Sequence, residues 1–202
     1  IRFRSMPLDS GRKPLDSGLK SVVLHNVSSI ADNATGNYTV NFSNNIGSNY
    51  GGGVWIQGNS WNQQFSPLFE NVTISGNYGH YGGGGMMLWS SNPTIINCVI
   101  NDNAALSGGG IYCEGSSPIL SNVEITNNYA DFGGGGMLIE VGSDPYISNT
   151  LIAGNHSNDE GGALACNGGV CNLDNVTIVG NYGDYSIIKI VDGELNINNS
   201  II

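Results

Sequence analysis

The chain has 202 residues, of which 40% are hydrophobic and 11% are charged, and its formal net charge is −10 at pH 7. This hydrophobic fraction supports one packed domain and argues against intrinsic disorder. The negative charge disfavours nucleic acid and anionic membrane surfaces as partners, since both attract basic proteins. No apolar run is long enough to span a bilayer.

Residues 1–20 differ from the rest of the chain. They carry five of the six basic residues and a doubled Pro-Leu-Asp-Ser-Gly, at 7–11 and 14–18. We interpret them as a basic N-terminal arm or cap, with three alternatives open: a cover for the end of the fold that follows, a linker, or an arm that docks onto the acidic body of a neighbouring copy.

Residues 21–202 contain a degenerate repeat of 24 to 27 residues. A strand-like heptad bounded by asparagines recurs at 71–77, 97–103, 122–128, 149–155 and 175–181. A glycine cluster follows most copies by a few residues, at 51–53, 83–85, 108–110, 134–136 and 161–162. A third short strand then begins at a proline, at Pro93, Pro118 and Pro145. Three short strands per period with turn residues between them indicate one coil of a solenoid.

The alternation of residues explains why such coils must stack. In Val123-Glu124-Ile125 the two apolar side chains lie on one face of the strand and the carboxylate lies on the other. A single coil cannot bury its apolar face, whereas coils about 4.8 Å apart pair their strands and share one core. The predicted inner columns are Val72, Cys98, Val123, Thr150, Val176 and Ile74, Ile100, Ile125, Ile152, Ile178.

The asparagine that ends each heptad falls at one corner of the predicted coil. Its side-chain amide can hydrogen-bond from coil to coil, and asparagine also tolerates a left-handed backbone at a sharp corner. The predicted ladder consists of Asn77, Asn103, Asn128, Asn155 and Asn181. We therefore predict an all-β, right-handed parallel β-helix of about six to seven coils, with three strands per coil. The pattern is still running at Asn199–Ile202, which allows the solenoid to continue in a longer protein.

The segment Ile100-Asn-Asp-Asn103, followed by Gly108-Gly-Gly-Ile111, resembles the repeat of the polymorphic outer membrane proteins, and Gly161-Gly-Ala-Leu164 matches its second tetrad. The chain is also similar to the pectate-lyase-like β-helices of large secreted surface proteins. The resemblance covers roughly residues 39–181. It implies export and surface display, as an adhesin or passenger domain. The chain departs from it by having Ile where those proteins favour Phe, and function transfers poorly across such a fold.

One coil is longer than the others, between Val54 and Asn71. It contains Trp61, Phe65 and several amides. An exposed ring beside amides is a suitable sugar-binding platform, because sugar rings stack on aromatic faces. The alternative is that Trp61 and Phe65 fold back over the first coils.

The strand after each glycine cluster carries apolar residues at its outward position. This stripe consists of Trp55, Met87, Tyr112, Leu138 and Ala165. An exposed apolar stripe suggests a partner: another subunit, a glycan, or a covering segment such as residues 1–38. A local error in register is the alternative.

The next outward column contains Trp89, Glu114 and Glu140. Carboxylates on adjacent coils are unfavourable neighbours unless something bridges them, and calcium suits carboxylate oxygens. The alternative is that Glu114 and Glu140 are solvated surface acids.

Enzymatic activity has little support in the composition. A polysaccharide lyase of the resembling kind needs a cation and a basic residue beside a uronate, but residues 21–188 contain no Lys or Arg and twelve acids. Hydrolysis of a neutral glycan needs two carboxylates, and Glu114 with Glu140 is one available pair. No catalytic residue is assigned.

Two of the four cysteines, Cys166 and Cys171, flank Asn-Gly-Gly-Val, and Cys171 occupies the place of the proline in other coils. A disulfide here would suit an exported protein, and two buried thiols are the alternative. We therefore expect a non-catalytic secreted or cell-surface scaffold that binds a neutral glycan or another subunit and can self-associate. We expect no cofactor; a calcium ion at Glu114 and Glu140 is the alternative that the paired carboxylates leave open. The alternative is a glycan-active enzyme or its binding module.

Overall fold

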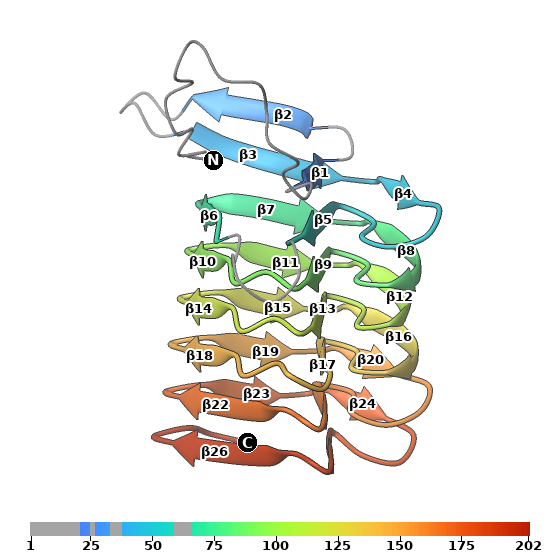
Figure 1. The fold of residues 1–202 in the computed structure, drawn as a ribbon, viewed down its shortest axis with the longest axis vertical. Helices are drawn as coiled ribbons and strands as arrows, with labels where there is room; N and C mark the ends of the chain where they lie inside the picture. The colour runs from blue at the N-terminus through green and yellow to red at the C-terminus, as the bar shows by residue number, and fades with distance from the viewer. Residues whose placement is uncertain (1–20, 25–26, 33–37, 59–65) are drawn as a thin grey trace, which may run out of the picture.

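The computed structural model describes residues 21–24, 27–32, 38–58 and 66–202, and these form a parallel β-solenoid. Coils of similar size stack along one axis, from the N-terminal coils at one end to the C-terminal coils at the other (Figure 1). The predicted fold class is confirmed, with about five full turns where six to seven were expected. In the described part of the chain, no helix is long and apolar enough to cross a bilayer.

The coil has four walls, so the prediction of three strands per coil is wrong. Equivalent strands of successive coils form four sheets, which we call sheets A, B, C and D. Following the chain through one coil, the strands belong to sheet C, then D, then B, then A. Sheet C contains β2 (Val27–Asp32), β3 (Tyr38–Ser43), β7 (Val72–Ser75), β11 (Val99–Asn101), β15 (Glu124–Thr126), β19 (Leu151–Ala153) and β23 (Thr177–Val179). Sheet D contains β4 (Ile46–Gly47), β8 (Tyr78–Gly82), β12 (Ala104–Ser107), β16 (Tyr129–Gly133), β20 (His156–Ser157) and β24 (Tyr182–Gly183).

The other two walls follow the glycine clusters and the prolines, as the repeat predicts. Sheet B contains β1 (Ser21–Leu24), β5 (Val54–Gln57), β9 (Met86–Trp89), β13 (Ile111–Glu114), β17 (Met137–Ile139), β21 (Leu164–Asn167) and β25 (Ile188–Val191). Sheet A contains β6 (Leu68–Glu70), β10 (Thr94–Ile96), β14 (Ile119–Ser121), β18 (Tyr146–Ser148), β22 (Val170–Asp174) and β26 (Glu194–Asn198).

The first two strands do not follow the parallel pattern. β1 pairs antiparallel with β5, and β2 pairs antiparallel with β3. Parallel stacking therefore begins at β3, and β1 and β2 lie beside the first coils as antiparallel strands (Figure 1). Such strands pair backbone groups that an open solenoid end would leave free.

Sheet D was missed because its inward side chains are too small to produce a hydrophobic alternation. The inward positions of β12, β16 and β20 are Ala105, Ala130 and Ser157, each at most 1% exposed. The second glycine of each cluster lies against this wall: a Cβ on Gly109 would collide with the carbonyl oxygen of Tyr129 in the next coil. The coil is narrow at sheet D, so only small residues fit inside it.

The core contains the predicted columns. All ten residues of the two columns in sheet C are buried, at 3% exposure or less, and the inward residues of sheet B are buried with them. Parallel pairing aligns these residues directly: Ile100 lies between Ile74 and Ile125. Equivalent side chains from successive coils therefore stack on one another and form one continuous core.

The predicted asparagine ladder is confirmed at the corner between sheets C and D. In each step, the backbone N–H and the side-chain Nδ2 of one asparagine both donate to Oδ1 of the next, as from Asn103 to Asn128 at 3.0 Å for both. The remaining Nδ2 proton of Asn128 is donated to the carbonyl oxygen of Ile100 at 2.9 Å. Each buried amide thus has a partner for every donor and acceptor, which burial requires. The ladder also includes Asn45.

The left-handed backbone lies elsewhere than we expected. The ladder asparagines do not have positive φ; instead the residue before each of them does, for example Asp102 at φ 55°. A second set of asparagines, at the corner between sheets A and C, is left-handed: Asn71, Asn97, Asn122, Asn149, Asn175 and Asn199. Members of this second set also bond from coil to coil, as Asn122 Nδ2 donates to Asn97 Oδ1 at 2.7 Å, but these two side chains are exposed, whereas those of the ladder are buried.

A serine ladder at the corner between sheets B and A was not anticipated. The backbone N–H of Ser91 donates to Oγ of Ser116 at 3.1 Å, and that of Ser116 donates to Oγ of Ser143 at 3.0 Å. All three serines are fully buried. They begin the segments Ser-Asn-Pro, Ser-Ser-Pro and Ser-Asp-Pro, so a serine two residues before each proline was the available sequence signal.

The ladder yields a stability prediction. We expect Asn128→Ala to lower the free energy of unfolding by about 3 kcal/mol, because the backbone N–H and one Nδ2 proton of Asn103 lose their buried acceptor, and the carbonyl oxygen of Ile100 loses the side-chain donor. Urea denaturation measures this loss. The exposed Asn49→Ala is the control and should change stability by less than about 0.5 kcal/mol. Equal stability of the two variants would contradict a stabilising ladder.

Candidate functional site

The outward positions of sheet B form a mostly covered surface. Trp55 and Tyr112 are half-buried, whereas Met87 is 0% and Leu138 is 5% exposed, and Ala165 is buried too. In the register Met87 lies between Trp55 and Tyr112, and Leu138 lies between Tyr112 and Ala165. The expected open apolar stripe is therefore not open: Met87 and Leu138 offer no free surface to a ligand or subunit.

Aromatic side chains gather at the N-terminal end of this surface. The centroid of the Tyr50 ring lies 6.0 Å from that of Trp55, 5.7 Å from that of Tyr81 and 6.1 Å from that of Trp89. We call these four residues the aromatic cluster. Tyr81 is 51% exposed and the other three are half-buried, so the cluster is open to solvent on one side.

Sequence reasoning identified Trp55 and Trp89 but missed Tyr50 and Tyr81. Both tyrosines stand directly before glycines at the start of their cluster segments, and parallel pairing through β4 and β8 brings them to the same corner. The available sequence signal was an aromatic residue directly before the glycines in two neighbouring coils. That these residues meet could not be predicted, because their positions depend on sheet D, which the repeat pattern did not reveal.

Polar groups border the aromatic cluster. Glu114 is next to Trp89 in the register, and Gln57 is next to it on the other side. Burial raises the pKa of Tyr112, and the carboxylates of Glu140 and Glu114 raise it further, so the phenol stays protonated at neutral pH and can donate a hydrogen bond. Among the described residues, the buried Nε1–H of Trp55 has no acceptor. The site thus combines ring faces with donors and acceptors.

The two glutamates occupy equivalent positions on consecutive coils, as predicted, because β13 pairs in parallel with β17. Glu140 Oε1 accepts a hydrogen bond from Asn167 Nδ2 at 3.3 Å. Within the described ranges, no three His, Cys, Asp or Glu side chains come together as a metal-binding group. Calcium at Glu114 and Glu140 would therefore have two protein carboxylates and otherwise water, which is a weak ligand set.

This ligand set predicts the response to a chelator. We expect the melting temperature to be the same with EDTA as with added calcium, since two carboxylates give too little binding energy to stabilise the fold. Differential scanning fluorimetry in both conditions measures this. Calcium bridging at the glutamates would be established if calcium raised the melting temperature of the wild type but did not change that of Glu114→Gln.

Three predicted features lie outside the described residues. These are Trp61, Phe65 and the basic arm of residues 1–20. Their roles as a sugar platform and as a cap or docking arm stay predictions.

Cys166 and Cys171 lie together inside the solenoid, at the end of β21 and in β22. Both are buried free thiols. Burial raises the pKa of Cys171, and its side-chain hydrogen bond with Cys166 raises it further. The Cys166 thiol also donates to the carbonyl oxygen of Gly169 at 3.3 Å. The turn brings the two sulfur atoms into contact, which is the first requirement for a disulfide.

We expect these thiols to form a disulfide when the protein refolds with oxidised glutathione. One thiolate would displace glutathione thiol to give a mixed disulfide, and the second thiolate would displace another glutathione thiol to close the bond. In the folded protein the reaction should be slow, because burial disfavours the thiolate. Mass spectrometry of the peptide that spans both cysteines measures the loss of two hydrogen atoms. Recovery of free thiols under these refolding conditions would establish the alternative of two buried thiols.

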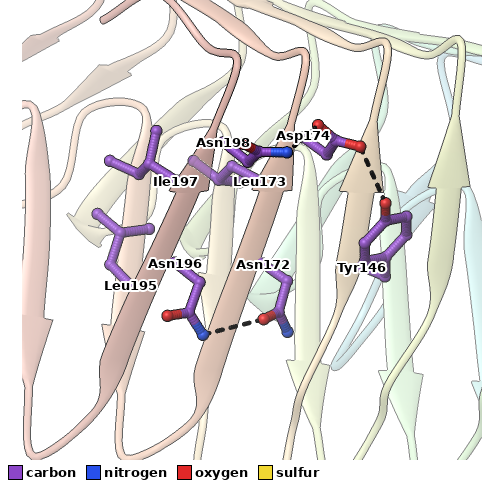
Figure 2. Close-up of a pocket in the computed structure, with 8 residues that line it drawn as sticks. All are labelled: Tyr146, Asn172, Leu173, Asp174, Leu195, Asn196, Ile197 and Asn198. Atoms are coloured by element: carbon purple, nitrogen blue, oxygen red, sulfur yellow. Dashed lines mark hydrogen bonds between the residues drawn. The ribbon is translucent and has the colours of Figure 1, made fainter.

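A depression of about 330 Å³ lies on the outside of sheet A near its last strands. Figure 2 shows its amide-rich lining, in which Tyr146 Oη donates to Asp174 Oδ2 at 3.2 Å and Asn196 Nδ2 donates to Asn172 Oδ1 at 3.1 Å. Leu195 also lines it, and the side chain of this residue packs against the core at the last described coil. The depression thus reflects the end of the stack rather than a constructed site.

Comparison with known proteins agrees with this architecture. Residues 28–202 match the family model described as a right-handed β-helix region. Neither curated proteins nor solved structures gave a match. The matched range begins one residue into β2 and includes every later strand, in keeping with the stacked coils and the continuous core. The chain belongs to the right-handed β-helix family.

Proposed function

We propose that this chain is a non-catalytic scaffold of an extracellular or cell-surface protein, and that the aromatic cluster binds a neutral glycan. The observation that carries the proposal is the group of four rings, open on one side and bordered by polar groups. A β-helix turns each coil into a platform for outward side chains, so its function depends on those side chains rather than on the fold.

The chemistry of the aromatic cluster suits a sugar. Sugar rings have apolar C–H faces, which pack on aromatic rings, and their hydroxyls need hydrogen-bond partners at the rim. Tyr81 and Trp89 offer ring surface, and Gln57 and Glu114 stand beside them with an amide and a carboxylate. Such a ligand would use both properties of the site.

Charge favours a neutral glycan over a polyanion. Residues 21–188 carry twelve acids and no Lys or Arg, and Lys189 pairs with Glu160. A uronate chain, a sulfated glycan or a nucleic acid would meet repulsion along the body of the solenoid. This distribution also supports the absence of uronate-lyase chemistry, which requires basic groups at the substrate.

Binding can be tested with matched variants of equivalent positions. Tyr81 precedes Gly82 in β8, and Phe132 precedes Gly133 two coils later, and both rings are exposed, at 51% and 62%. We expect Tyr81→Ala and Trp89→Ala each to weaken glycan binding about 3- to 10-fold, through the loss of about 1 kcal/mol of ring contact. Phe132→Ala should bind as the wild type does. A glycan array identifies the ligand and isothermal titration calorimetry measures its affinity.

The same experiment separates binding from catalysis. Incubation of the bound glycan with wild-type protein and with Glu114→Gln should leave its length unchanged in both cases. Shortening of the glycan by the wild type alone would support the alternative of a neutral-glycan hydrolase that uses Glu114 and Glu140. Failure of the wild type to bind any neutral glycan would refute the proposed function.

A further inference from the structure

A second group of rings lies on the outside of sheet D, at residues that the repeat pattern did not single out. Parallel pairing aligns Tyr129, His156 and Tyr182 on three consecutive coils. Their ring centroids are 5.4 Å and 4.9 Å apart, and each pair is arranged edge to face. We call these three residues the ring ridge. It runs along the solenoid axis rather than across it.

A row of polar side chains runs parallel to the ring ridge. Tyr129 Oη donates to Asp131 Oδ1 at 2.8 Å, and Tyr182 makes the equivalent hydrogen bond with Asp184. Asn158 lies between the two aspartates in the stack, and its amide donates to Tyr129 Oη and, at 3.4 Å, to Asp131 Oδ1. The sequence signal is a tyrosine or histidine followed two residues later by an aspartate or asparagine.

The hydrogen bonds hold the rings in position at the surface. Each tyrosine hydroxyl is hydrogen-bonded to the carboxylate two residues further along the chain, which raises the pKa of both hydroxyls and keeps them protonated. Tyr182 is 55% exposed, and Asn158 and Asp184 are also exposed. The side chains are thus ordered before any ligand arrives, which lowers the entropic cost of binding.

We propose that the ring ridge binds a linear, neutral, β-1,4-linked polysaccharide whose chain runs along the solenoid axis. Coils repeat about every 4.8 Å, which is close to the rise per sugar of an extended β-1,4-linked chain. Successive sugars would therefore meet successive coils, in contact with the exposed ring surface of the ridge and with their hydroxyls on Asp131, Asn158 and Asp184. A helical α-1,4-linked chain cannot follow this straight row.

Charge restricts the ligand in the same way as at the aromatic cluster. The ridge is bordered by carboxylates, and Lys189, the one Lys or Arg in the described ranges, is paired with Glu160. An anionic chain would be repelled and a neutral one would not. The inference shares the ligand class of the proposed function but uses different residues on a different wall.

The test uses cellohexaose and mannohexaose as probes, with maltohexaose and hexagalacturonate as controls for chain shape and charge. We expect the wild type to bind one or both β-1,4-linked hexasaccharides, and to bind the matching disaccharide at least about tenfold more weakly, since it spans fewer coils. Tyr182→Ala should weaken hexasaccharide binding about 3- to 10-fold. Tyr129→Phe, which keeps the ring and loses the bonds to Asp131 and Asn158, should weaken it less.

Tyr185→Ala is the matched control, because Tyr185 is 78% exposed and lies outside the ring ridge. The melting temperature of each variant shows whether the fold is intact. The inference is overturned if neither β-1,4-linked hexasaccharide binds, if maltohexaose binds equally well, or if Tyr182→Ala binds as the wild type does. Loss of hexasaccharide binding in Trp89→Ala with full binding in Tyr182→Ala would place the glycan at the aromatic cluster alone.

Discussion

The structure depends on one constraint, which is that every coil must stack on the next at the spacing of paired β-strands. Stacking buries the inside of the coil completely, including the corner where the chain turns from sheet C into sheet D. Polar backbone groups at that corner would be costly to bury alone. The asparagine ladder removes this cost, because Asn103 and Asn128 satisfy both the corner backbone and each other. The same residue type must therefore return in each coil.

A second consequence of stacking is that each corner of the coil is stabilised by its own residue type. Asparagine amides bond from coil to coil between sheets C and D, and serine hydroxyls such as that of Ser116 do so between sheets B and A. Left-handed asparagines such as Asn97 turn the chain between sheets A and C. Glycines such as Gly109 allow the close approach of sheet D. These internal demands leave the outward side chains free to differ from coil to coil, so the outer walls can carry specific functions.

The outer walls carry different groups of aromatic side chains in different coils. The aromatic cluster around Tyr50 and Trp89 lies at the N-terminal coils, and the ring ridge around His156 lies on sheet D at the later coils. Both stand in a body rich in acids and, from residue 21 to 188, without Lys or Arg. In both places ring faces adjoin amide or carboxylate groups. A long neutral polymer could contact more than one coil at once, and each added contact would increase its residence on the scaffold.

The sequence by itself determined the solenoid, the inner columns such as Ile74–Ile100–Ile125 and the asparagine ladder, because each arises from a residue type that repeats once per coil. The tertiary structure alone decided the rest. Sheet D escaped prediction because Ala105 and its equivalents are small and produce no hydrophobic alternation. The full burial of Met87, an outward residue, does not follow from the repeat, and the grouping of Tyr50 with Trp89 depends on which coils meet at one corner. The periodicity of the sequence predicts which residues face inward, because the core requires them once per coil. Contacts between outward side chains depend on how neighbouring coils are placed relative to one another.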